Sequence, residues 1–90
     1  MVLFTKDGTD SLELLSQLGA RIAYLRKAKG ISQLALALEA DISKSYLSDL
    51  EAGRRNASVL ILSRVSAGLG VTLEELFRGI VPLEQLLKAH

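Results

Sequence analysis

The sequence predicts an all-α protein, and three observations lead to that prediction. Apolar residues recur at spacings of three and four along much of the 90-residue chain, which is the period of one face of an α-helix. No stretch of useful length alternates apolar and polar residues, as a half-buried strand would. Apolar residues make up 49% of the chain and are almost all aliphatic, because aromatic residues account for only 4%. We therefore expect a bundle of helices around an aliphatic core.

The first helix is expected at about residues 11–29. Asp10 and Glu13 can accept the free N–H groups of its first turn, and Gly30 can end it. Gly19 lies within this span and is either a tolerated weak point or a position of close packing. The apolar face of this helix consists of Leu12, Leu15, Leu18, Ile22 and Leu25.

Two short helices are expected next, at residues 33–40 and 44–52. Ser32 and Ser43 can cap their first turns, and Gly53 can end the second of them. The turn between them has about three residues, which fits two helices that meet at a steep angle. Close packing of the first of these helices is expected from Leu34, Ala35, Ala37 and Leu38.

A fourth and a fifth helix follow in the sequence. Asn56 is expected to begin the fourth, and Gly70 to end it. Thr72 and Glu75 have the spacing of a capping box, which predicts the start of the fifth. The apolar stripe of the fourth helix is expected from Leu60, Ile61, Val65 and Leu69. The fifth helix contains Leu73, Leu76 and Phe77.

The chain is expected to divide into a flexible N-terminal segment, residues 1–10, a single domain, residues 11–79, and an apolar tail, residues 80–90. Gly79 and Pro82 come just before a last short helix that is expected in this tail. The apolar residues of that helix are Leu83, Leu86 and Leu87.

Missing residue types exclude several classes of site. Cysteine is absent, which removes disulfides, thiolate metal sites and cysteine nucleophiles. The single histidine is His90, so imidazole is not available as a buried general base or as one of a pair of metal ligands. No apolar run approaches the roughly 20 residues that a membrane span requires. We expect a soluble cytoplasmic protein with no metal, no cofactor and no catalytic residue.

The net charge of +1 hides an uneven distribution along the chain. Residues 21–64 carry eight basic and four acidic side chains, whereas residues 1–20 and 65–90 are both slightly acidic. A basic centre between acidic ends suits an oriented surface that binds a polyanion. Solvated surface charge would give the same pattern, so charge alone does not decide between the two.

Residues 32–53 read SQLALALEADISKSYLSDLEAG, and this stretch resembles the helix-turn-helix of the Cro/repressor-type DNA-binding proteins, the XRE family. The similarity extends over residues 18–77 and includes LGARI and LRK in the first helix and LGVTLEELF after the fourth. The resemblance implies a five-helix repressor-like bundle, followed here by a short C-terminal helix. Two departures should each cost some stability: Asp41 stands where the family usually has glycine at a positive φ, and Ala57 where a proline commonly follows Asn56.

The resemblance also implies which residues contact DNA. The third helix turns Leu47 and Leu50 inward, and its opposite face would read bases in the major groove through Lys44, Ser45, Ser48 and Asp49. Lysine can donate to guanine O6 and N7, and aspartate can accept from cytosine N4. Arg26 and Glu51 would form a structural salt bridge between the first and third helices. Contacts to the DNA backbone or its flanks are implied for Gln33, Ser43, Tyr46, Arg54, Arg55 and Asn56.

The predicted function is a sequence-specific transcription regulator that binds double-stranded DNA as a homodimer on a palindromic operator. Restriction-modification controller proteins and small phage-type repressors of this family have the same one-domain layout. The dimer surface is expected from Leu73, Leu76, Phe77, Ile80, Val81, Leu83, Leu86 and Leu87. The alternative for the apolar tail, residues 80–90, is that it packs onto the core of its own chain.

The alternative function is an antitoxin, or another protein-interaction module, whose DNA binding is secondary. The protein partners considered are a toxin and RNA polymerase, and no small-molecule ligand or membrane partner is expected. An enzyme is disfavoured because the sequence contains no nucleophile elbow and no phosphate loop. Glu74 and Glu75 are sequence neighbours, which do not face each other on a helix.

Overall fold

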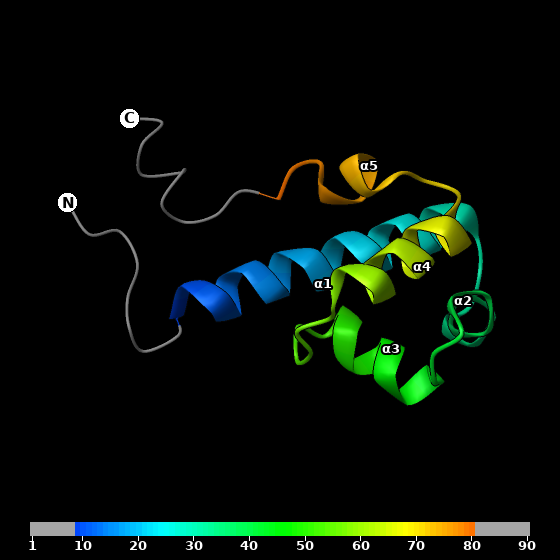
Figure 1. Ribbon diagram of the computed structural model, residues 1–90, viewed down its shortest axis with the longest axis horizontal. Coiled ribbons are helices and arrows are strands. Elements are labelled where there is room, and N and C mark those ends of the chain that lie inside the picture. The colour runs from blue at the N-terminus through cyan, green and yellow to red at the C-terminus, as the bar shows by residue number, and fades with distance from the viewer. Residues whose placement is uncertain (1–8, 81–90) are drawn as a thin grey trace.

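The computed structural model describes residues 9–80, and within this range the chain forms five α-helices and no strand (Figure 1). The all-α prediction is therefore confirmed. The predicted last short helix, with Leu83, Leu86 and Leu87, lies outside the described residues. The helices are α1 (Thr9–Lys29), α2 (Gln33–Ala40), α3 (Lys44–Glu51), α4 (Val59–Leu69) and α5 (Leu73–Phe77).

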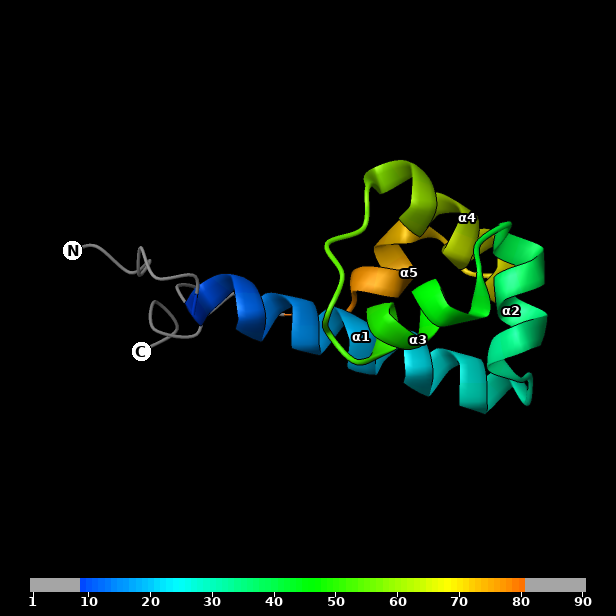
Figure 2. The ribbon, with the colours of Figure 1, turned by 90° about the horizontal axis from the view of Figure 1, so that it is seen from below.

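Helix α1 is the longest element and supports three of the others. It packs against α3, α4 and α5, while α2 packs against α3 and α4. In Figure 1, α5 lies above α1 and α3 lies below it, and Figures 1 and 2 both show the first turns of α1 extending beyond the other helices. No helix within residues 9–80 is both long enough and apolar enough to cross a membrane.

A serine or threonine side chain caps the first turn of each of the four later helices. Ser32 accepts a hydrogen bond from the Ala35 N–H at 3.0 Å, and Ser43 accepts one from the Tyr46 N–H at 2.9 Å. Thr72 does the same for Glu75 at 3.1 Å. These caps satisfy N–H groups that have no partner within the helix, and they confirm the predicted starts of α2, α3 and α5.

The predicted starts of two other helices were wrong. Helix α4 begins after Ser58, whose side chain accepts from the Ile61 N–H at 3.2 Å, and not at Asn56. Residues 54–58 form a connecting segment without helical structure. Helix α1 begins at Thr9, so Asp10 lies inside the helix and not before it as the predicted cap.

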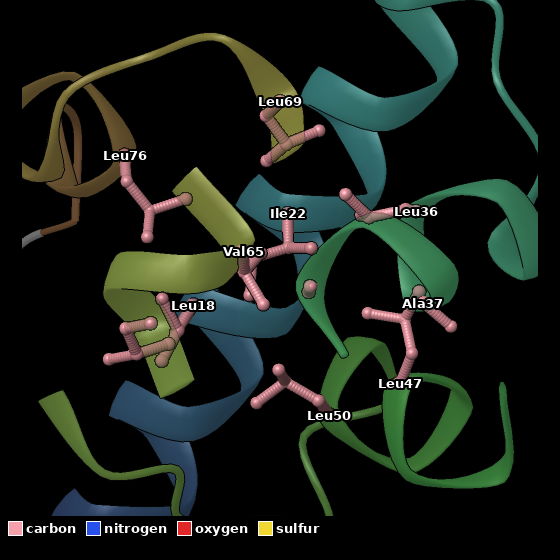
Figure 3. Packing of buried hydrophobic residues seen from close by; sticks show 11 residues of the cluster. Leu18, Ile22, Leu36, Ala37, Leu47, Leu50, Val65, Leu69 and Leu76 are labelled. Carbon is pink, nitrogen blue, oxygen red and sulfur yellow. The ribbon is translucent and has the colours of Figure 1, made fainter. Parts of the chain in front are cut away.

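Within residues 9–80, every helix contributes to one core of eleven buried apolar residues (Figure 3). Burying a leucine or isoleucine side chain completely contributes about 1.5–3 kcal/mol, so this cluster dominates the stability of the bundle. In Figure 3 the labelled side chains from all five helices point toward one another. The core consists of Leu18, Ile22, Leu36, Ala37, Ala40, Leu47, Leu50, Leu62, Val65, Leu69 and Leu76.

Several apolar residues that were predicted to pack are exposed instead. Leu34 and Leu38 are 52% and 72% exposed, because α2 turns the opposite face, with Leu36, toward the core. Helix α2 is apolar on both of these faces, so its sequence period does not choose between them. In α4, Leu60 is 66% exposed, because the helix turns the face with Leu62 and Val65 toward the core. Leu12, at 63%, lies near the start of α1.

Asp41 ends α2 in the left-handed region, with φ 56° and ψ 48°, as the family position predicts. It is the only residue other than glycine with a positive φ between residues 9 and 80. The Ile42 N–H donates to the Ala37 carbonyl at 3.0 Å and closes the turn before α3. Aspartate adopts this conformation at a cost that glycine does not have.

Replacing Asp41 with glycine is therefore expected to stabilise the fold by about 0.5–1 kcal/mol, after the greater chain entropy of unfolded glycine is counted. Asp41→Ala should have the opposite sign, because alanine tolerates a positive φ less well than aspartate. The midpoint of urea unfolding for the two variants checks this. An Asp41→Gly midpoint below that of the wild type would contradict it.

Candidate nucleic-acid interface

Helices α2 and α3 pack against each other and share one outward face. Ala37 is 1% exposed within α2, and a small side chain there lets the two helices approach closely. Leu47 and Leu50 anchor the inner side of α3 in the core. The opposite side of α3 is consequently held on the outside of the molecule, where Figure 2 shows the helix in front of α1.

The outer face of α3 carries short polar side chains beside the first residue of α2. Lys44 and Ser45 are exposed, and Ser48 is half-buried. Together with Gln33 these three residues line one shallow depression. Three of the four predicted base-reading residues thus lie together, next to a predicted phosphate contact.

Asp49, the fourth predicted base-reading residue, does not line this depression. Its carboxylate accepts from Arg54 Nη2 at 3.1 Å and Nε at 3.3 Å, and Arg55 Nε lies 3.9 Å from its other oxygen. Asp49 is therefore paired with the two arginines that follow α3. The sequence did not predict these pairs. Asp49 lies within α3 and the two arginines follow its end, so the distance between their side chains depends on the path of the chain after the helix.

Tyr46 and Arg55 form a second contact that the sequence does not reveal. The Arg55 guanidinium carbon lies 4.9 Å from the centre of the Tyr46 ring, within the range of a cation–π interaction. The Tyr46 ring is half-buried against the core and forms a fixed support. Ser43 is occupied as the cap of α3, while Asn56 is exposed in the connecting segment.

Arg26 and Glu51 form an ion pair between α1 and α3, with side chains only 11% and 6% exposed. Arg26 donates from Nε to Glu51 Oε2 at 2.7 Å and from Nη2 to Oε1 at 3.0 Å. Its Nη1 donates to the Ile31 carbonyl at 3.0 Å. The hydrogen bonds to Glu51 raise the pKa of Arg26 above its ordinary value, so this guanidinium stays charged at every pH at which a protein is normally handled.

Gln33 joins this ion pair to the outer surface. Its Nε2 donates to Glu51 Oε1 at 2.9 Å, which fixes the amide group at the start of α2. A glutamine amide has two N–H donors, so one remains for a phosphate oxygen. The positive end of the helix dipole favours an anion at the same place.

The predicted dimer residues differ widely in accessibility. Leu76 is fully buried in the core of the single chain. Phe77 is 40% exposed, and Leu73 and Ile80 are half-buried against the core. The remaining predicted residues, Val81, Leu83, Leu86 and Leu87, lie outside the described range.

The family model that matches this chain is that of the helix-turn-helix family HTH_3, over residues 22–76. The control protein C.MunI from Mycoplasma sp is 44% identical over 63 residues, which cover 69% of this chain and 85% of that protein. The HTH-type transcriptional regulator SlrR from Bacillus subtilis (strain 168) is 51% identical over 61 residues. These cover 67% of this chain and 40% of SlrR, so the chain spans less than half of that longer relative.

Solved structures show the same likeness. The restriction-modification controller protein C.AhdI from Aeromonas hydrophila superposes with a TM-score of 0.69 and 36% identity. The match covers 70% of this chain and 96% of C.AhdI.

Proposed function

This chain belongs to the helix-turn-helix family HTH_3, and from this premise we propose that it binds a palindromic operator as a homodimer. Like the relatives that it resembles, it is a DNA-binding transcriptional regulator and not an enzyme. The observation that carries the proposal is the outward polar face of α3 beside the N-terminus of α2. The similarity to C.MunI and C.AhdI supports a controller-type regulator that acts in the cytoplasm, where its DNA lies.

Helix α3 is proposed to enter the major groove and read base edges. The groove is about 12 Å wide and admits one α-helix. Lys44 is exposed at the start of α3 and can donate to guanine O6 and N7, while the hydroxyls of Ser45 and Ser48 can serve several base edges. Asp49 is proposed to accept from cytosine N4 when its arginine partners turn to the DNA backbone.

The residues around this face are proposed to hold the DNA backbone. Gln33 offers an amide N–H at the positive end of α2, and the exposed Arg54 and Arg55 offer guanidinium donors after α3. Such contacts fix the position of the protein on the duplex without reading its sequence. Ser43, Tyr46 and Asn56 are proposed to complete this set.

Mutations are expected to distinguish residues that contact bases from residues that contact phosphates, because only the former affect the choice of sequence. Lys44→Ala should cost about 1–3 kcal/mol on a preferred operator, selected from a pool of random duplexes, and relax the choice of base at one position per half-site. Arg55→Ala should weaken binding to operator and scrambled duplex alike and lower the salt slope by about 1 for each phosphate that the protein no longer neutralises.

The measurement is a set of fluorescence-anisotropy titrations at several salt concentrations, on both duplexes and for both variants. If Lys44→Ala stays folded and keeps the full preference for the operator, α3 is not the base-reading element. A protein-interaction module with secondary DNA binding would then be the better assignment.

A homodimer is expected to place two copies of α3 about 34 Å apart, because two half-sites one helical turn apart mirror the symmetry of the protein. Phe77→Glu should weaken dimerisation at least about tenfold, since it would bury an unpaired charge. Leu38→Glu is the matched control, because Leu38 is also an exposed apolar residue but lies on α2. Sedimentation at micromolar concentration measures both, and a wild-type monomer, free and on a palindromic duplex, would contradict the dimer.

A further inference from the structure

The end of α3 holds one carboxylate between two guanidinium groups on the face proposed to approach DNA. Asp49 Oδ1 accepts from Arg54 at 3.1 Å and 3.3 Å, and Asp49 Oδ2 lies 3.9 Å from Arg55 Nε. The arginine side chains are 66% and 52% exposed, and that of Asp49 is 35% exposed. Both guanidinium groups therefore remain accessible to a competing anion.

The backbone keeps this arrangement together. The Arg54 N–H donates to the Asp49 carbonyl at 2.8 Å, and the Gly53 N–H donates to the Leu50 carbonyl at 3.1 Å. Gly53 adopts φ 78°, which reverses the chain at the end of α3 and returns it beside Asp49. Arg55 is supported on a second side by the ring of Tyr46.

A DNA phosphate and the Asp49 carboxylate would compete for the same guanidinium donors. While Asp49 is paired, the three side chains present a net charge of +1 where the two arginines alone would present +2. Sequence-independent binding depends on the number of cations that reach phosphates, so the pairs lower it. At an operator, base contacts of α3 offset the cost of opening the pairs, whereas a random sequence offers no such compensation.

We propose that Asp49 restrains sequence-independent DNA binding by holding Arg54 and Arg55 in ion pairs, and thereby sets the ratio of operator affinity to non-specific affinity. This inference rests on the proposed function and gives Asp49 a role that base reading does not include. Removing a base contact alone would lower operator affinity and leave binding to random DNA unchanged. Removing the restraint raises binding to random DNA.

The test is a titration of a scrambled duplex with the full chain and its Asp49→Asn variant at several salt concentrations. Exposed ion pairs are weak, so the affinity of Asp49→Asn for scrambled DNA should rise by about 3- to 10-fold, with a steeper salt slope. Glu39→Gln removes one exposed acidic charge from α2 and leaves both pairs intact, so its gain should be clearly smaller. Thermal melting verifies that each variant is folded.

A second pair of variants distinguishes the restraint from a general charge effect. With Arg54 and Arg55 both replaced by alanine, adding Asp49→Asn should no longer raise the affinity for scrambled DNA beyond the Glu39→Gln gain. If wild-type protein binds DNA and Asp49→Asn matches it in random-sequence affinity and salt slope, the restraint is wrong while the proposed function stands. If no duplex is bound at all, the proposed function fails, and the inference fails with it.

Discussion

Gly19→Ala is expected to destabilise the fold by about 3 kcal/mol, at the upper end of the usual cost of overpacking. A Cβ atom at this position would lie 2.5 Å from the carbonyl oxygens of both Leu50 and Glu51 and 2.8 Å from the Glu51 carbonyl carbon. All three are backbone atoms at the end of α3, so no side-chain rotation relieves the clash. The end of α3 must move away from α1.

The predicted loss of stability in Gly19→Ala is opposite in sign to the usual effect of replacing a helical glycine with alanine. Glycine within a helix is ordinarily less stable than alanine by about 0.5–1 kcal/mol, so the same substitution at an open helical site would stabilise the protein. Gly30→Ala, just after the end of α1, is the control for the steric clash: its Cβ would meet nothing within 4 Å, so its φ of 77° leaves only a backbone strain of about 1–2 kcal/mol. Urea unfolding measures both variants. A Gly19→Ala variant as stable as the wild type would contradict the close crossing of α1 and α3.

Arg26→Ala is expected to lower stability by about 3–5 kcal/mol, the usual cost of removing one partner of a buried ion pair. The Glu51 side chain is only 6% exposed, and without Arg26 its carboxylate would keep only the hydrogen bond from the Gln33 amide among these contacts. Helix α3 would no longer have its ionic link to α1, and the Ile31 carbonyl would no longer accept from the Arg26 guanidinium. Thermal and urea unfolding at neutral pH measure the change in stability.

Two further variants test whether the unpaired charge is the cause. The double replacement Arg26→Met with Glu51→Leu removes both charges and should recover much of the stability, since an apolar pair can substitute for a buried ion pair. Lys27→Ala, an exposed neighbour on α1, should change stability by no more than about 0.5 kcal/mol. If Arg26→Ala and Lys27→Ala unfold at the same urea concentration, the ion pair is not a structural element of the bundle.

The class of fold and most helix boundaries could be predicted from the sequence, because the signals for them are local. Ser32, Ser43 and Thr72 each cap a helix within three residues of their own position, and a helical period repeats over one or two turns. The resemblance across residues 32–53 indicated the helix-turn-helix for a related reason: both helices and the turn between them lie in one continuous segment of the sequence.

The sequence by itself determined an all-helical chain, the helix-turn-helix and the polar outward side of α3. Only the tertiary structure decided that α2 buries Leu36 and exposes Leu34 and Leu38, because both faces of that helix are apolar and the neighbouring helices choose between them. It also decided that Gly19 is a point of close approach, since the atoms that exclude a side chain there belong to α3, more than thirty residues later. The pairing of Asp49 with Arg54 and Arg55 likewise depends on the path of the chain after α3, which brings together charges whose spacing along the sequence does not specify a contact.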